Sequence, residues 1–214
     1  MSFQRARNDE QRAERRRLIL ATTRRMLEQS PAAELTLNEL SRQVGLAKSN
    51  VVRYFETREA ILLTVLEEEL GLWADDVTGR LAPDATGAQV AALLAETMAA
   101  RPVMCDLMSI HSAVLERNVS TAVALAHKRG IVAPFWKIAQ AVMESLPGIT
   151  EAVAVKLVTV AFLNAGALWP NSRPNAALRE AYASDPLVAT FQPDFEVELR
   201  ATLGFVIAGM LAQA

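Results

Sequence analysis

The sequence predicts an all-α protein in which a small N-terminal helical region precedes a larger helical region. Apolar residues recur at helical spacing along most of the 214-residue chain, and strand-type alternation is nowhere convincing. Pro83, Pro102 and the pair Pro147 and Gly148 stand between apolar segments, where they are expected to end helices. Hydrophobic residues make up 51% of the chain, a high share for a soluble protein. We expect the surplus to cover a cavity or a subunit interface.

The individual helices follow from this periodicity and from the helix-ending residues. The first is one amphipathic helix within residues 4–29, with an arginine-rich lead-in that includes Arg5 and Arg7. In the larger region, helices are expected over residues 58–81, 86–101, 102–117, 120–146, 150–169, 176–183 and 194–212. Pro134 is expected to kink the fourth of these.

Residues 36–55 predict two short helices joined by a tight turn. Thr36 and Glu39 have the spacing of a capping box, in which the hydroxyl accepts from the backbone of Glu39 and the carboxylate accepts from the backbone of Thr36. Gly45 can end the first helix in the left-handed conformation without steric cost. The second helix then covers residues 47–55.

The second helix has a polar outer face that suits the major groove of DNA. Val51 and Phe55 are expected to face inward. The outward residues are then Lys48, Ser49, Asn50, Val52 and Arg53. Asparagine can pair with adenine, arginine can pair with guanine, and valine can touch the methyl group of thymine. An ordinary amphipathic helix pair is the alternative, because its solvent face would be equally polar.

Charge is divided unevenly between the two regions. Residues 1–58 contain 12 Lys and Arg against 7 Asp and Glu, whereas residues 59–214 contain 10 against 17. The net charge of −2 is therefore the sum of +5 over residues 1–58, the basic head, and −7 over residues 59–214, the acidic body. A basic head beside two such helices favours a polyphosphate partner through counterion release. A run of charge on its own is more often a solvated face.

These features resemble the tetracycline-repressor (TetR/AcrR) family of bacterial one-component transcriptional regulators. The match covers about residues 15–70. The family pattern is met at Gly45, Leu46, Lys48, Asn50, Val51, Tyr54, Phe55, Thr57, Arg58, Glu59 and Ile61. Ala47 stands where the family usually has Ser or Thr, so the second helix lacks its customary N-cap. Ser41 replaces a common alanine, and Val52 and Arg53 stand where the family often has aromatic residues, so no operator sequence can be carried over.

The resemblance implies a three-helix helix-turn-helix DNA-binding domain at residues 1–58, followed by a helical ligand-binding and dimerisation domain at residues 59–214. It implies a regulator, mostly a repressor among such proteins, that binds a palindromic double-stranded DNA operator as a dimer. The residues expected to face base edges are Ser49, Asn50 and Arg53. The residues expected to hold phosphates are Thr36, Lys48, Tyr54 and Arg58. Core packing is an equally good interpretation of Tyr54.

The last two long segments predict a homodimer. Residues 150–169 and 194–212 are apolar over most of their circumference, and a helix of that kind is buried on two sides. We expect two helices from each copy to form a four-helix bundle, as the family also does. The alternative is a deep monomer core. Dimerisation would set two recognition helices about one DNA turn, roughly 34–36 Å, apart.

A small, mainly hydrophobic effector is expected to bind among the middle helices and to change the spacing of the two heads. Methionines and aromatic residues suit an adaptable apolar site. The candidate pocket residues are Met104, Met108, His111, Trp136, Phe162 and Trp169. For each of them, ordinary core packing is the alternative.

The sequence does not indicate an enzyme, a cofactor or a metal site. Motifs such as G-x-S-x-G, G-x-G-x-x-G, the P-loop and H-E-x-x-H are absent. His111, His127 and Cys105 are a poor inventory of metal ligands. The alternative function from another class is a helical protein-interaction module that binds a partner through the apolar C-terminal helices, without specific DNA binding.

The chain is expected in the cytoplasm, with no membrane association. Its polar, arginine-rich N-terminus lacks the apolar run of a secretory leader. The apolar run from Leu157 to Trp169 is 13 residues long, too short to span a membrane. A single cysteine rules out an internal disulfide, in keeping with a reducing compartment.

Overall fold

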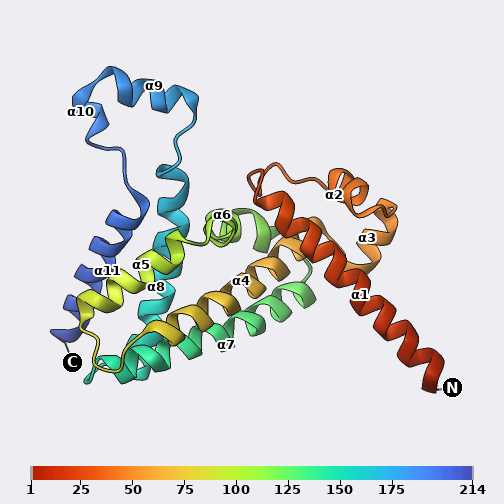
Figure 1. Ribbon diagram of the computed structural model, residues 1–214, viewed down its shortest axis with the longest axis horizontal. Helices are drawn as coiled ribbons and strands as arrows, with labels where there is room; N and C mark the ends of the chain where they lie inside the picture. The colour runs from red at the N-terminus through yellow and green to blue at the C-terminus, as the bar shows by residue number, and fades with distance from the viewer. Residues whose placement is uncertain (1, 214) are drawn as a thin grey trace.

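The computed structural model describes residues 2–213, with the backbone alone for residues 2–8, so the side chains of Arg5 and Arg7 lie outside the described residues. Within that range the chain is all-helical and contains no strand, as predicted (Figure 1). The helices are α1 (Ser2–Leu27), α2 (Leu37–Val44), α3 (Lys48–Phe55), α4 (Arg58–Arg80), α5 (Gly87–Ala99), α6 (Pro102–Ile110), η1 (His111–Leu115), η2 (Glu116–Asn118), α7 (Thr121–Ser145), α8 (Glu151–Asn171), α9 (Ala176–Ser184), α10 (Pro186–Ala189) and α11 (Phe195–Leu211).

The helices form a head and a body that share α4. The head is made by α1, α2 and α3, and the two chain termini lie at opposite ends of the molecule (Figure 1). In the body, α4 packs along α7, α6 and α7 pack on α8, and α11 packs against α5 and α8. Helices α9 and α10 form an arm that projects from the body (Figure 1). One continuous apolar core runs from Ile19 in α1 to Ile207 in α11.

The predicted turn between the two short helices is present. Gly45 has a φ of 71°, and its N–H donates to the carbonyl of Arg42. The hydroxyl of Thr36 accepts from the backbone N–H of Glu39 at 3.2 Å. The return bond of the capping box was a wrong prediction, because the carboxylate of Glu39 accepts from Arg42 and from Gln43 instead. Two nearby side-chain donors compete successfully with one backbone N–H.

Two helix boundaries in the body differ from the predictions. The helix expected over residues 102–117 is regular only to Ile110, after which the chain forms the π-helical turn η1 and the 3₁₀ turn η2. Helix α8 continues through Pro170 to Asn171, because a proline in the last turn breaks few of the remaining hydrogen bonds. Helix α7 is continuous through Pro134.

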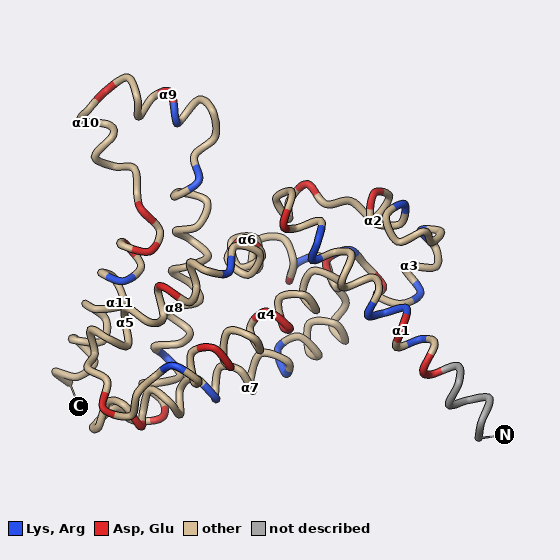
Figure 2. The backbone as a smooth tube through the Cα atoms, viewed as in Figure 1, with Lys and Arg blue, Asp and Glu red and all other residues tan. Residues whose placement is uncertain are grey.

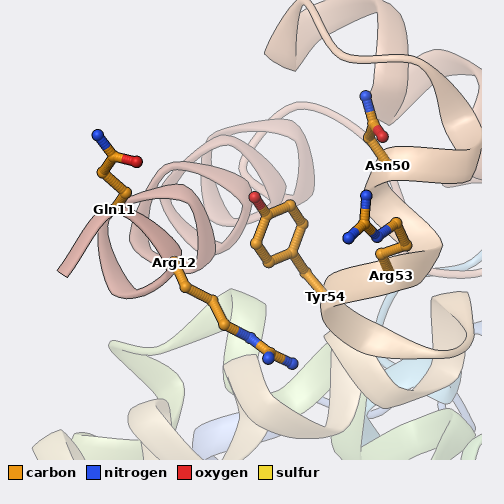
Figure 3. A pocket seen from close by; sticks show the side chains of 5 residues that line it. All are labelled: Gln11, Arg12, Asn50, Arg53 and Tyr54. Carbon is orange, nitrogen blue, oxygen red and sulfur yellow. The ribbon is translucent and has the colours of Figure 1, made fainter. Parts of the chain in front are cut away.

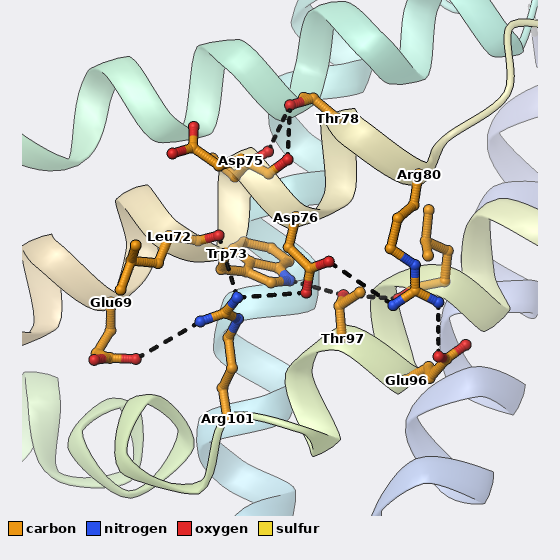
Figure 4. Close-up of polar contacts among 12 residues, drawn as sticks. Glu69, Leu72, Trp73, Asp75, Asp76, Thr78, Arg80, Glu96, Thr97 and Arg101 are labelled. Carbon is orange, nitrogen blue, oxygen red and sulfur yellow. Dashed lines mark hydrogen bonds and ion pairs between the residues drawn. The ribbon is translucent and has the colours of Figure 1, made fainter.

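Carboxylates of α4 bind arginines from both the head and the body. The buried Glu69 accepts from Arg24 of α1 at 2.8 Å, and its other oxygen lies 3.9 Å from Arg101 at the start of α6. Figure 4 shows Arg101 also reaching Asp76, at 3.4 Å. Close by, the indole N–H of the buried Trp73 donates to Thr97 of α5 at 3.0 Å. These contacts fix three helices around the middle of α4.

Among residues 2–213, α8 is the helix long and apolar enough to cross a membrane by length and composition alone. It has 21 residues and a mean hydropathy of 1.7 over an 18-residue window, of which 44% is buried. It is thus longer than the apolar run expected from the sequence. Its packing against α6, α7 and α11 is that of a core helix in a bundle.

Replacing Gly45 by alanine should lower the free energy of unfolding by about 1–2 kcal/mol, because a Cβ is strained at positive φ. No atom lies within 4 Å of the added Cβ, so backbone strain is the only cost. The control is Gly71→Ala, in the middle of α4 and equally free of neighbours. It should raise the stability by about 0.5–1 kcal/mol. Denaturant titrations would measure both, and equal effects would contradict the assigned turn.

Cys105 should not react with a thiol reagent while the protein is folded. Its side chain is fully buried and its Sγ lies 3.3 Å from the carbonyl oxygen of Met98. Burial raises the pKa of the thiol far above its usual value, so the reactive thiolate is scarce. A colorimetric thiol assay at pH 8 should detect no rapid reaction in buffer and one thiol per chain in denaturant. Rapid reaction of the native protein would contradict this packing.

Candidate nucleic-acid interface

Helix α3 presents its polar face to solvent. Val51 and Phe55 are buried, as the spacing predicts. The exposed residues of α3 are Lys48, Ser49, Asn50, Val52 and Arg53. Ala47 caps the helix without a side-chain hydrogen bond, so the first N–H groups of α3 stay free for other acceptors.

Asn50 and Arg53 lie on one side of a hollow that α1 completes. The hollow has a volume of about 400 Å³ and is also bordered by Gln11, Arg12 and Tyr54. In Figure 3 the Tyr54 ring reaches from α3 towards α1, with its hydroxyl in the hollow. Tyr54 is half-buried, so it packs in the head and still offers its hydroxyl to a ligand.

Basic side chains gather around this surface. Figure 2 shows Lys and Arg along α1 and beside α2 and α3. Arg12 and Arg15 of α1 are exposed, as are Lys48 and Arg53 of α3. The head therefore offers polar side chains at its centre and cations around them, which is the distribution that duplex DNA requires.

Arg16 holds α3 against α1, a role that the sequence reasoning missed. Its guanidinium donates to the carbonyl of Tyr54 and lies 4.0 Å from the centre of the Phe55 ring. Burial and the neighbouring Arg12 lower the pKa of Arg16. The sequence could have indicated this role, because Arg16 stands one turn before Ile19, on the edge of the apolar face of α1.

Thr36 and Arg58, the remaining predicted phosphate contacts, lie in different surroundings. Thr36 is exposed at the start of α2. Arg58 points inward, where it donates to the carbonyl of Ala32 and pairs with Glu59 at 3.1 Å. Asp106 of α6 accepts from the N–H of the same Ala32 at 2.6 Å. These contacts fix the loop between α1 and α2, and they favour a structural role for Arg58 over the predicted phosphate contact.

The predicted effector residues lie in the interior of the body. Met104, Met108, His111 and Phe162 are buried, and Trp136 is half-buried. Trp169 is buried too and borders a cavity of about 230 Å³ between α1, α6 and α8. The guanidinium of Arg173 lies 3.8 Å from the centre of the Trp169 ring.

A second polar group of the body was not foreseen. The rings of His111 and His127 meet with their Nε2 atoms 2.9 Å apart, and both are buried. Burial lowers the pKa of His111 to about 4, so its ring is neutral at pH 7. No sequence pattern indicates this pair, because the two histidines are 16 residues apart on different helices.

Two family models cover most of the chain. Residues 19–65 match the model described as "Bacterial regulatory proteins, tetR family". Residues 67–214 match the model described as "Tetracyclin repressor-like, C-terminal domain". The chain belongs to the tetracycline-repressor family. As such it is a DNA-binding transcriptional regulator, and regulators of this family are not enzymes.

Curated relatives of this family align with part of the chain. The regulator EthR, "HTH-type transcriptional regulator EthR" of Mycobacterium tuberculosis and Mycobacterium bovis, is 37% identical over 49 residues. That alignment spans 23% of this chain and 23% of EthR. The likeness is therefore limited to about a quarter of each chain.

Solved structures of other family members share the whole fold. The repressor AlkX of Dietzia sp. strain DQ12-45-1b superposes with a TM-score of 0.55 at 11% identity, over 93% of this chain and 96% of AlkX. A regulator from Rhodococcus sp. RHA1 gives 0.56 at 14% identity, over 91% and 96%. FadR of Bacillus subtilis, solved in complex with stearoyl-CoA, gives 0.51 at 14% identity, over 89% and 96%. At such identities the likeness extends to the fold alone.

Proposed function

We propose that the protein is a repressor that binds a palindromic operator as a homodimer and leaves the DNA when a small hydrophobic effector binds the body. The exposed face of α3 within the basic head is the observation that carries this proposal. Ser49, Asn50 and Arg53 contact base edges, and Lys48, Thr36 and Tyr54 contact phosphates. Arg58 supports the head from within.

The apolar faces of α8 and α11 support the homodimer. Leu163 of α8 is 55% exposed, and Val197 and Phe205 of α11 are 57% and 80% exposed. Solvent-facing apolar side chains on two adjacent helices favour burial against a second copy. Gly204 has no atom within 4 Å of its Cβ position, so a partner helix can approach closely there.

The effector site rests on the composition of the body. Methionines and aromatic residues surround the contact of α6 with α8, and FadR, which has this fold, was solved with stearoyl-CoA. In this chain those side chains pack together, so an effector would open the site by parting the helices around Phe162 and Trp169. Residues 1–58 would then act as the DNA-binding unit and residues 59–214 as the effector-binding and dimerisation unit, in the cytoplasm where the operator is.

Arg53→Ala should relax the base preference at one position of each half-site and cost about 1–3 kcal/mol of specific binding. Lys48→Ala should weaken all duplexes alike and reduce the salt slope by about 1. Arg129→Ala, an exposed arginine of α7, carries the same charge change as a control and should leave both unchanged. Gel-shift titrations at several salt concentrations measure these effects.

Two results would contradict the assigned roles. One is an unchanged base preference in Arg53→Ala, and the other is an unchanged salt slope in Lys48→Ala. Absence of salt-sensitive duplex binding in the dimeric wild type would favour the helical protein-interaction module instead.

Phe205→Glu should convert the dimer to a monomer at micromolar concentration, because a charge buried without a partner in an apolar interface is costly. Val132→Glu, on the exposed side of α7, is the control and should remain dimeric. Sedimentation velocity distinguishes the two species. A monomeric wild type, or a dimeric Phe205→Glu variant, would contradict the proposed interface.

A further inference from the structure

We infer that His111, His127 and Glu116 form a binding site for one divalent transition-metal ion such as Zn²⁺. The ligand atoms of the three side chains all lie within 4.8 Å of one another. They come from η1, α7 and η2, so the fold rather than the local sequence assembles them. Both histidines of the chain are used, and both are buried.

The spacing of the ligand atoms suits a single ion. The two Nε2 atoms are 2.9 Å apart, and the Nε2 of His111 lies 3.4 Å from Oε1 of Glu116. With metal–ligand distances of about 2.0–2.2 Å, two ligands of one ion are about 2.9 Å apart at a right angle and about 3.4 Å apart at a tetrahedral angle. The third pair, Nε2 of His127 and the carboxylate of Glu116, lies within 4.8 Å, so the Glu116 side chain would move towards His127 as the ion binds. Two imidazoles and one carboxylate leave a position for water, as in open zinc sites.

The ligands are oriented by further side chains. Oε1 of Glu67 lies 2.8 Å from Nδ1 of His127, so that ring donates to the carboxylate and turns the lone pair of its Nε2 towards His111. The hydroxyl of Ser112 lies 3.4 Å from Nδ1 of His111. A carboxylate behind a ligating histidine is the usual second layer of a metal site. For both Nε2 atoms to bind a metal, His111 must carry its proton on Nδ1, and that N–H can donate a hydrogen bond to the hydroxyl oxygen of Ser112.

Two backbone features make room for this arrangement. In an α-helix, residues five apart point about 140° from one another, but the π-helical turn bonds the N–H of Glu116 to the carbonyl of His111 and brings the two side chains together. On α7, a Cβ at Gly130 would lie 2.8 Å from the carboxylate of Glu67. Glycine at this position therefore lets Glu67 stand beside His127.

The ammonium of Lys128 competes with a metal ion for the carboxylate of Glu116. Its ammonium lies 2.5 Å from Oε1 of Glu116, the oxygen that faces His111. The lysine side chain is 55% exposed, so it can turn into solvent or bind the second oxygen when an ion arrives. The charged and titratable groups around the site are thus Glu67 from α4, Glu116 from η2, His111 from η1, and His127 and Lys128 from α7.

The site opens towards the head. His127 and Glu67 border a cavity of about 520 Å³ that also touches Arg53, Tyr54 and Phe55 of α3. The hydroxyl of Ser120, which caps α7, donates to Glu56 in the turn after α3 at 3.0 Å. An ion bound by residues of η1, η2 and α7 would thus lie close to the cavity that borders the recognition helix. This coupling, unlike the site itself, rests on the proposed function.

Titration of the full, metal-free chain with Zn²⁺ by calorimetry tests the site. We expect saturation at one ion per chain, and visible d–d absorption when Co²⁺ is used instead. Glu116→Gln and His111→Gln should weaken binding at least tenfold and remove the Co²⁺ absorption, and Glu67→Gln should weaken it about tenfold. Glu144→Gln, an exposed carboxylate elsewhere on α7, should bind as the wild type does.

Thermal melts of the metal-free variants show whether each one folds, and the partly exposed Glu116 makes Glu116→Gln the decisive variant. Binding that does not saturate at one ion, or equal affinity in wild type and a folded Glu116→Gln, would overturn the site. Duplex binding with and without Zn²⁺ tests the coupling. If the protein binds one Zn²⁺ per chain but never binds DNA, the proposed function is contradicted and the metal site is still supported.

Discussion

Two ion pairs on one buried carboxylate hold the head and body together. Glu69 of α4 accepts from Arg24 of the head at 2.8 Å and faces Arg101 of the body at 3.9 Å. A carboxylate this deep is stable only while both arginines satisfy it, because an unpaired buried charge is costly. The loop between α1 and α2 is fixed in the same way, since Ala32 bonds Asp106 through its N–H and Arg58 through its carbonyl. The head is therefore built onto the body, and these contacts tie α1 and the loop after it to α4 and α6.

The opposite side of α4 carries the second connection. There α7 packs along α4, its capping Ser120 donates to Glu56, and His127 of α7 contacts Glu67 of α4. A change that separates α4 from α7 would alter the angle of α3, which Arg16 keeps seated on α1. In a dimer, such a rotation in each copy would change the distance between two recognition helices, and that distance decides whether both fit one face of the duplex.

Local chemistry predicted much of this structure. Helix ends are marked by a glycine in the left-handed region, by threonine caps and by prolines between apolar runs. Each of these residues acts on the backbone next to it, so the sequence predicts the helix-turn-helix and most helices of the body. The exposed face of α3 followed from its buried Val51 and Phe55. What escaped prediction depends on contacts between distant residues: the π-helical turn at His111, the pairing of that ring with His127, and the inward turn of Arg58 towards Ala32. No local pattern encodes which helix will pack opposite a given side chain.

The proposed function requires that two copies of α3 contact duplex DNA at once, with side chains that distinguish bases. The sharpest test is to select bound duplexes from a random pool with the full chain. We expect an enriched inverted repeat whose half-site centres are about one helical turn, or a whole number of turns, apart. Recovery of no common sequence, or of a single half-site without a symmetric mate, would contradict it.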